Sequence, residues 1–244
     1  MNLENTLANH RVLRLGVNTL GNDYVVGDIH GHVSRLLAQL DEMGFDQSVD
    51  RLICVGDLID RGPESDKAIE LLAHPWFFSV LGNHEYFMLS GLKYGNSKHK
   101  MLWLQNGGDW IATSDPSRWS QWFDLLSALP IAIEIEVNCD EAFVVNSSAD
   151  KLVGIVHADF PGFDWSHIHS FDEGHLEKCL WSRSQFKDRS EHVVAGIDAI
   201  YHGHSINGTA NSDQMASCVV QLGNRFYIEP GVYKGARFVI ERLT

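Results

Sequence analysis

The sequence predicts an α/β fold at the boundary with α+β, in which residues 1–244 form a single domain with two β-sheets. In the first ninety residues, short apolar runs alternate with helical patterns, which is typical of βαβ units and of a parallel sheet buried on both faces. From residue 130 the apolar residues recur with a period of two, as expected for the strands of a second sheet. We find no linker or low-complexity tract that would divide the chain.

The first part of the chain repeats one pattern of strand, glycine and polar residue. Strands are expected at residues 24–26, 52–55 and 77–81. A helical pattern follows each of them, near residues 36–43, 68–72 and 87–92. Asp28, Asp57 and Asn83 each follow a glycine just past the carboxyl end of one of these strands. Open α/β sheets bind ligands at that edge, so we expect these three residues to lie together.

The second part of the chain begins with a helical region at residues 98–129 that is rich in tryptophan. Most of its rings are expected to lie in a core or a cap: Trp103, Trp110, Trp119 and Trp122. Another helix is expected near residues 171–182. The expected strands are 131–137, 143–145, 152–156, a strand ending at His202-Gly203-His204, 218–222, 225–228 and 237–240. Gly223-Asn224 is expected to be a two-residue hairpin turn.

Composition excludes several classes of protein. The chain has 32 Asp and Glu against 19 Lys and Arg, a net charge of −13, which argues against binding to nucleic acid or to an anionic membrane surface. Four widely spaced cysteines predict neither a disulfide framework nor a thiolate zinc site. Without a signal peptide or an apolar run of membrane-spanning length, we expect a cytoplasmic protein. Thirteen histidines together with many acids are the ligand stock of a metal site.

Three motifs combine ligand-type residues at successive strand ends. They are Gly27-Asp28-Ile29-His30-Gly31, Gly56-Asp57-Leu58-Ile59-Asp60-Arg61-Gly62 and Gly82-Asn83-His84-Glu85. His157 and His204 each end a later apolar strand. A single Gly-Asp after a strand indicates only a turn, and a lone histidine is more often structural than a ligand. Five strand ends with such residues instead predict two cations that share one centre, held about 3.5–4 Å apart by a bridging carboxylate.

With these motifs the sequence resembles the calcineurin-like metallophosphoesterases, and among them the bacteriophage lambda-type and bacterial serine/threonine protein phosphatases. Further segments share the likeness: Pro75-Trp76-Phe77, Trp103-Leu104-Gln105-Asn106-Gly107-Gly108, Leu129-Pro130, His157-Ala158-Asp159-Phe160-Pro161, Leu180-Trp181-Ser182-Arg183 and Gly203-His204-Ser205. The resemblance runs from about residue 24 to 240. It implies two mixed sheets packed as a sandwich and flanked by helices (αββα), with the dinuclear metal site at the carboxyl ends of the strands.

The resemblance also implies which residues bind the two metal ions. Asp28 and His30 would hold the first ion, and Asp57 would bridge both. The second ion would be held by three further residues: Asn83, His157 and His204. Nitrogen and oxygen ligands without thiolate admit Mn, Fe, Zn, Co or Ni. We expect two divalent ions per chain, with Mn²⁺ first because it is the usual activator of the phage and bacterial branch.

Two positions depart from the pattern of the family. His32 stands where many relatives have a cysteine after the first motif. Ile206 stands where broader relatives have a second histidine after Gly-His, so the first metal ion would have only three protein ligands.

His202 has no role in the family. Three more histidines are expected in a solvated loop near the rim of the site: His167, His169 and His175.

Four residues receive catalytic roles by the same resemblance. His84 would protonate the leaving alkoxide, oriented by Asp60 behind it, and such proton transfer contributes about 10²–10⁴-fold. Arg61 and Arg183, with Asn83 and His84, would bind the phosphate group. The attack on phosphorus would come directly from a hydroxide that bridges the metals, without a covalent phosphoenzyme.

The sequence therefore predicts a metal-dependent phosphomonoesterase acting on phosphoserine or phosphothreonine in proteins or peptides, and also on phosphotyrosine and aryl phosphates. One alternative is a dinucleoside polyphosphate hydrolase, the diadenosine tetraphosphatase branch. That branch shares the motif to which Pro63 and Ser65 fit, but it usually has alanine at the position of Asp60. A second alternative is a non-catalytic phosphoprotein-binding module, which would not need His84. No motif predicts the oligomeric state.

Overall fold

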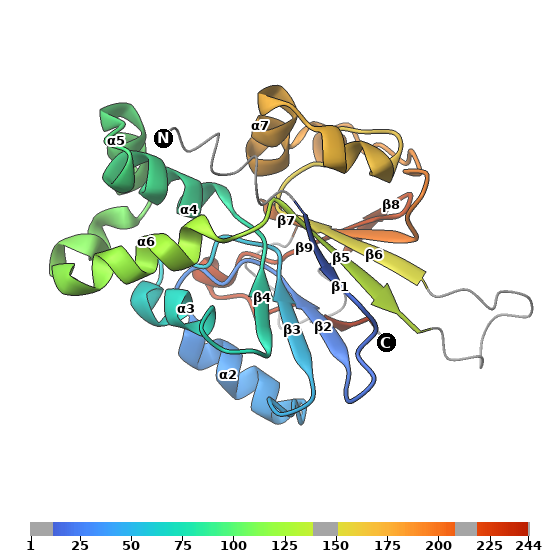
Figure 1. Cartoon of the computed structure of the whole chain (residues 1–244), viewed down its shortest axis with the longest axis horizontal. Coiled ribbons are helices and arrows are strands. Elements are labelled where there is room, and N and C mark those ends of the chain that lie inside the picture. The colour runs from blue at the N-terminus through green and yellow to red at the C-terminus, as the bar shows by residue number, and fades with distance from the viewer. Residues whose placement is uncertain (1–11, 139–150, 208–218, 244) are drawn as a thin grey trace, which may run out of the picture.

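The computed structural model describes residues 12–138, 151–207 and 219–243, in which two mixed β-sheets pack face to face between helices (Figure 1). Helices α2 (Val33–Glu42) and α3 (Ser65–Leu71) cover the outer face of one sheet, and α7 (Glu173–Trp181) lies over the other. This arrangement confirms the fold class and the layer order expected from the sequence and its resemblance.

The smaller sheet has the strand order β10-β2-β3-β4, and only β10 runs antiparallel to its neighbour. Its strands are β2 (Asp23–Val26), β3 (Arg51–Cys54), β4 (Phe77–Ser79) and β10 (Ile240–Arg242). Helix α2 connects β2 to β3, and α3 connects β3 to β4, since parallel strands require a crossover. The alternation of strand and helix predicted for the first ninety residues is therefore confirmed.

The larger sheet has the strand order β1-β5-β6-β7-β9-β8 and mixes parallel with antiparallel pairs. Its strands are β1 (Val12–Leu15), β5 (Ala132–Val137), β6 (Lys151–Val156), β7 (Ala199–Ile206), β8 (Val220–Leu222) and β9 (Arg225–Glu229). The turn Gly223-Asn224 joins β8 to β9 as predicted, with Gly223 in the left-handed region at φ 62°.

Alternating side chains divide the core into an inner and an outer part. Val25 and Ile53, which pair in register, pack between the two sheets, whereas Val26 and Leu52 pack beneath the helices. Ile133 and alternate residues of β5 supply the facing side of the inner core. Both faces of β2 and β3 are therefore buried, as the continuous apolar runs in their sequences predict.

The remaining helices are α4 (Asn83–Met88), α5 (Ser97–Gln105), α6 (Trp119–Ser127) and α8 (Ser184–Lys187). A π-helical turn, Leu89–Lys93, continues α4. Of the tryptophans expected in a core or cap, Trp103 and Trp122 are fully buried and Trp110 and Trp119 are half-buried. No helix within the described ranges is long and apolar enough to cross a membrane.

Several strand boundaries differ from the prediction. The strand expected at 77–81 ends at Ser79, because only the Val80 N–H still donates to β3, at the Cys54 carbonyl, and the Leu81 N–H donates to the Pro130 carbonyl instead. The strand expected at 237–240 begins only at Ile240, since the Phe238 N–H bonds the Gln39 side chain of α2. Strand β1 was not predicted. The strand expected at 143–145 and the start of the one expected at 218 lie outside the described residues.

Helix α2 offers a matched pair for testing its packing. Leu36 is fully buried, whereas its neighbour Leu37 is 36% exposed. We expect Leu36→Ala to lower the free energy of unfolding by about 2–5 kcal/mol, because it leaves a cavity beneath the helix. Leu37→Ala should cost less than about 1 kcal/mol. Urea denaturation of both variants measures the difference, and equal losses would contradict the described orientation of α2.

Candidate metal centre

The six predicted metal ligands lie at one edge of the sandwich, where strands of both sheets end. Each follows or interrupts a strand: Asp28 and His30 after β2, Asp57 after β3, Asn83 after β4, His157 after β6 and His204 within β7. None of the six is more than 7% exposed. The structure thus brings together residues that are up to 176 positions apart, as in the contact between Asp28 and His204.

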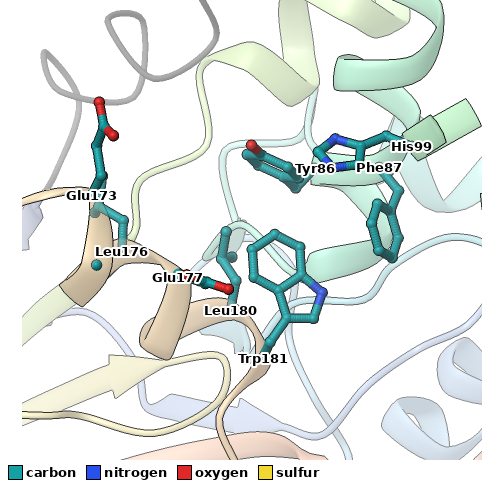
Figure 2. A pocket seen from close by; sticks show the side chains of 9 residues that line it. Tyr86, Phe87, His99, Glu173, Leu176, Glu177, Leu180 and Trp181 are labelled. Carbon is teal, nitrogen blue, oxygen red and sulfur yellow. The ribbon is translucent and has the colours of Figure 1, made fainter. Parts of the chain in front are cut away.

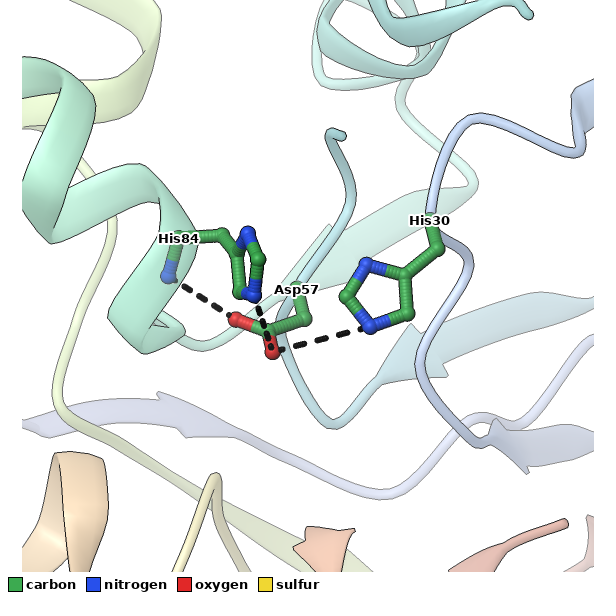
Figure 3. A group of neighbouring side chains, drawn as sticks. All are labelled: His30, Asp57 and His84. Atoms are coloured by element: carbon green, nitrogen blue, oxygen red, sulfur yellow. Dashed lines mark hydrogen bonds and ion pairs between the residues drawn. The ribbon is translucent and has the colours of Figure 1, made fainter. Parts of the chain in front are cut away.

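The Asp57 carboxylate lies between two groups of potential ligand atoms. Its Oδ2 atom is 3.8 Å from His30 Nε2 and 3.9 Å from His84 Nε2 (Figure 3). Its Oδ1 atom is 3.4 Å from His157 Nε2. Within the described part of the chain, two groups of side chains could hold a metal ion: His30 with Asp57 and His84, and Asp57 with His157 and His204. Asp57 belongs to both, which is the position required of a bridging ligand.

Asp28 and Asn83 lie beside these groups. Asp28 Oδ2 is 3.9 Å from His30 Nε2, and both of its oxygens accept the His204 N–H at 3.2 Å. Asn83 Oδ1 is 3.0 Å from His157 Nε2. The first group thus contains His84 in the place where the sequence analysis puts Asp28. The assignment of Asp28, and not His84, to the first metal ion stays a prediction.

A hydrogen bond at one ring nitrogen determines which nitrogen of each histidine faces the metal centre. His30 Nδ1 lies 3.0 Å from the Ile59 carbonyl, and His157 Nδ1 lies 2.8 Å from the Val55 carbonyl, so both rings direct Nε2 to the centre. His204 is reversed, because its Nε2 lies 3.2 Å from the Trp181 carbonyl and leaves Nδ1 for a metal ion. Burial and the neighbouring His157 lower the pKa of His204 to about 2, so the ring is neutral, as metal binding requires.

The centre concentrates buried carboxyl groups that need positive charge. Burial, followed by repulsion from Glu229 and Asp57, raises the pKa of Asp28 well above its usual value. Burial likewise raises the pKa of Glu85 and of Glu229 to about 7. Divalent cations would compensate this repulsion, and carboxylate and imidazole donors suit hard or borderline ions. The residues present therefore fit a metal centre.

Backbone strain is concentrated at this centre. Among the described residues, six other than glycine have positive φ, and five of them are predicted site residues. Their φ values are 45° for His30, 49° for Asp57, 74° for Asp60, 69° for Arg61 and 59° for His204. Each such conformation costs on the order of 1–3 kcal/mol and persists only where its surroundings enforce it. The register shift between β7 and β9 at His202 to Ile206 provides that constraint for His204.

Two glycines leave space for the predicted metal ligands. A Cβ atom on Gly203 would collide with the Asp28 carboxylate, and one on Gly82 would collide with Asp57. Gly203 lies between two buried histidines, and only the absence of its side chain lets Asp28 approach the β7 backbone.

His84 forms the centre of a buried hydrogen-bonded group. Its Nδ1 atom is 2.6 Å from Asp60 Oδ2. Trp103 Nε1 donates to the same Asp60 oxygen at 2.7 Å, and Trp110 Nε1 donates to Oδ1 at 2.7 Å. The Asp60 N–H donates to Ser65 Oγ at 2.8 Å. These hydrogen bonds fix the position and orientation of the Asp60 carboxylate. The His84 ring is held at Nδ1, so its Nε2 atom faces the metal centre.

Burial favours the neutral ring of His84, but the carboxylates of Asp57 and Asp60 outweigh it and raise its pKa above the usual value. A histidine that retains its proton near neutral pH is suited to act as an acid. The resemblance to the family pairs Asp60 with His84 but implies no role in the site for Trp103 and Trp110. Their position in the Trp-rich segment beside Gly107-Gly108, a motif shared with the family, was the available signal.

The two predicted phosphate-binding arginines stand exposed at the mouth of the centre. Arg61 packs its guanidinium over the Tyr233 ring, 4.4 Å from its centroid, and donates to His30 Nε2 at 2.7 Å. Arg183 donates to the His204 carbonyl at 3.3 Å. Both can reach a ligand at the metal centre, and neither contacts a carboxylate that would neutralise it within the described residues.

Buried acids that the sequence analysis missed hold the ligand loops. Glu85 accepts the N–H groups of Asp57 at 3.0 Å and Leu58 at 2.8 Å, which anchors the loop after β3. Glu229 accepts the Asp28 N–H at 3.1 Å. Glu85 could have been noticed in the Gly82-Asn83-His84-Glu85 motif, but Glu229 lies in β9 without a sequence signal.

Among the described residues, the other histidines singled out in the sequence lie outside the two groups. The loop expected around three of them is instead a short 3-10 helix (Trp165–Ser170), which contains His167 and His169, and the start of α7, which contains His175. His202 is buried with Nδ1 3.1 Å from the Val156 carbonyl, and burial lowers its pKa to about 3. His32 precedes α2 and makes no side-chain cap. His169 lies 3.1 Å from Glu134, and His175 lies 2.5 Å from Asp172.

A two-sheet sandwich with buried carboxylates and imidazoles at its strand ends is the arrangement that the resemblance to the metallophosphoesterases implies. The sequence profile of the calcineurin-like phosphoesterases matches residues 24–208, so the chain belongs to this family of hydrolases. It is 34% identical over 223 residues to serine/threonine-protein phosphatase 1 of Salmonella typhimurium, covering 90% of this chain and 91% of that protein. The resemblance inferred from the motifs is confirmed.

The chain is also similar to a tetraphosphatase relative and to a further solved structure. A symmetrical bis(5'-nucleosyl)-tetraphosphatase of Colwellia psychrerythraea is 29% identical over 140 residues, covering 55% of this chain and 46% of that protein. A crystal structure provisionally assigned as a diadenosine tetraphosphatase superposes with a TM-score of 0.61 at 20% identity, covering 96% of this chain and 94% of that one. The latter shows the shared fold.

The hydrogen bonds of Asp60 generate a prediction about the two tryptophans. Trp103→Phe or Trp110→Phe removes one donor from a buried carboxylate, so we expect a loss of about 1.5–3 kcal/mol in unfolding free energy and a lower kcat at unchanged KM. Trp122→Phe is the control, because Trp122 is as buried as Trp103 and its Nε1 has no acceptor among the described residues. Steady-state kinetics and urea denaturation measure both effects, and an unchanged kcat in Trp103→Phe would refute the positioning of Asp60.

Proposed function

We propose that this protein is a serine/threonine protein phosphatase that hydrolyses phosphomonoesters with the help of two divalent metal ions, Mn²⁺ first. The observation that carries the proposal is the His84–Asp60 pair, whose free Nε2 atom lies 3.9 Å from Asp57. The alkoxide of serine or threonine is a strongly basic leaving group, so its departure requires a proton donor at this place. Phosphotyrosine and aryl phosphates, which have better leaving groups, would also be accepted.

The chain contributes positioning, charge and a proton to this reaction. Divalent ions held by the six ligands would neutralise phosphoryl oxygens and lower the pKa of water near the phosphorus atom. Arg61 and Arg183 bind the remaining phosphoryl oxygens, for which the planar guanidinium is suited. His84 donates its Nε2 proton to the departing oxygen, and Asp60 stabilises the ring on the Nδ1 side. Asn83, which precedes His84 and whose Oδ1 lies 3.0 Å from His157 Nε2, is available to the substrate phosphate.

The relatives support this assignment to different degrees. The Salmonella phosphatase matches nearly the full length of the chain, whereas the Colwellia tetraphosphatase matches about half of it. Asp60 also favours a monoesterase, since the tetraphosphatase branch usually has alanine there. Ser65, which fits the motif of the tetraphosphatase branch, accepts the Asp60 N–H in this structure.

Hydrolysis of dinucleoside tetraphosphates is the second candidate. It is favoured by the Colwellia relative and by Pro63 and Ser65 in the motif after β3. In that reaction the leaving group is a nucleotide that departs through a phosphate oxygen. This oxygen needs little protonation, so such an enzyme has less use for a buried acid pair. A non-catalytic phosphoprotein-binding module is the weakest candidate, because binding alone gives no reason for the His84–Asp60 pair.

Substrate preference tests the proposal directly. With Mn²⁺ supplied, we expect kcat/KM for a phosphothreonine peptide to exceed that for diadenosine tetraphosphate by about 100-fold or more, because the acid pair accelerates alkoxide departure. Phosphate release from both substrates measures the ratio. A preference for diadenosine tetraphosphate would establish the second candidate instead, and binding without turnover of either would establish the third.

Metal content distinguishes the role of His84 from that of Asp57. His84→Asn should retain the metal ions and lose about 10²–10⁴-fold in kcat, since only the acid is removed. Asp57→Asn should lose both metal and activity, because a shared ligand is removed. Elemental analysis of the purified variants and their kinetics provide the measurement. Loss of metal in His84→Asn would make His84 a ligand, as its place in the first group allows.

A further inference from the structure

A pocket of about 530 Å³ lies between helices α4, α5 and α7 (Figure 2). Tyr86 and Phe87 of α4 line one side, and Leu180 and Trp181 of α7 line the other. The Trp181 ring is perpendicular to that of Tyr86, at 90° with centroids 5.0 Å apart, and 5.6 Å from that of Phe87. The pocket therefore offers aromatic edges and faces on two sides.

The pocket adjoins the metal centre. Helix α4 begins at the predicted ligand Asn83, so Tyr86 and Phe87 lie one turn beyond it. On the other side, the Trp181 carbonyl bonds the ring of His204, and Arg183 follows two residues later. A substrate whose phosphate is held at the centre would thus extend its neighbouring residues toward this pocket.

The charge of the pocket is negative. In Figure 2, Glu177 directs its carboxyl group toward the Trp181 ring, and Glu173 stands at the rim. The pocket also contains His99, and burial together with the nearby Lys98 lowers the pKa of its ring from the usual value. None of the described residues that line the pocket is Lys or Arg. Two carboxylates there are without a cationic partner among these residues.

We propose that this pocket binds a lysine or arginine side chain of the substrate, close in sequence to the phosphorylated serine or threonine. The inference rests on the proposed phosphatase function and adds a substrate class to it. The aliphatic stem of such a side chain packs on Leu180 and Trp181, and its charged end meets the aromatic faces and Glu177. An apolar or aromatic side chain would use the rings but would leave the exposed Glu177 carboxylate without a cationic partner.

A pair of phosphothreonine peptides tests this pocket. One has lysine at the four positions on each side of the phosphothreonine, and the other has norleucine there, which keeps the stem and removes the charge. We expect the Mn²⁺-loaded protein to hydrolyse the lysine peptide with about tenfold higher kcat/KM, mainly through KM. Equal kcat/KM values, or a preference for norleucine, would overturn the inference.

Variants of Glu177 locate the effect in the pocket. Glu177→Gln should reduce the preference for lysine several-fold while leaving hydrolysis of a small aryl phosphate unchanged, because that substrate does not reach the pocket. Glu177→Lys should reverse the preference toward a peptide with glutamate in place of lysine. Glu191→Gln is the control, since it removes one exposed charge elsewhere and should leave the preference intact. An equal loss in Glu191→Gln would assign the effect to net charge and overturn the pocket.

Different results would contradict the proposed phosphatase function and the inference about the pocket. Turnover of the aryl phosphate without turnover of either peptide would overturn the phosphatase assignment and the inference with it. Turnover of both peptides at one rate would leave the phosphatase assignment in place and remove only the pocket.

Discussion

The position of the Asp57 carboxylate is the constraint on which the rest of the site depends. It lies between two groups of histidines, and each group is incomplete without it. Its backbone is held at φ 49° by the hydrogen bonds that Glu85 makes to the loop after β3. Helix α4 begins with Asn83, His84 and Glu85. Its first turn contacts the same loop, because the His84 N–H donates to Asp57 Oδ1. A single buried loop thus sets the position of metal ligands, acid and arginine together.

Much of this arrangement could be predicted from the sequence because its signals are local. Apolar runs that end in glycine and a polar residue predict β2, β3 and β4 and place Asp28, Asp57 and Asn83 at one edge. The same argument places His157, which follows β6 of the other sheet, but it is wrong about His204, which lies within β7 and not at its end. Motif order at strand ends carried the information, since parallel strands of one sheet end at a common edge.

What the sequence did not predict arises from contacts across large separations. Trp103 and Trp110 donate to Asp60 over 43 and 50 positions, and Glu229 reaches Asp28 over 201. No periodicity encodes such pairs. The positive φ angles of His30, Asp57 and His204 were equally invisible, because strain at residues other than glycine is imposed by tertiary packing. Strand β1, short and only partly buried, gave too weak an apolar signal.

The metal centre lies across the seam of the sandwich, with Asp57 contributed by the smaller sheet and His157 and His204 by the larger one. Ions bound there would connect the two sheets through ligands from both of them. Any ligand that binds only the folded state stabilises it by mass action, by about 2.7 kcal/mol at a hundred times its dissociation constant. The supply of metal would therefore govern how long the folded chain survives as well as how fast it turns over, coupling the lifetime of the protein to its cofactor.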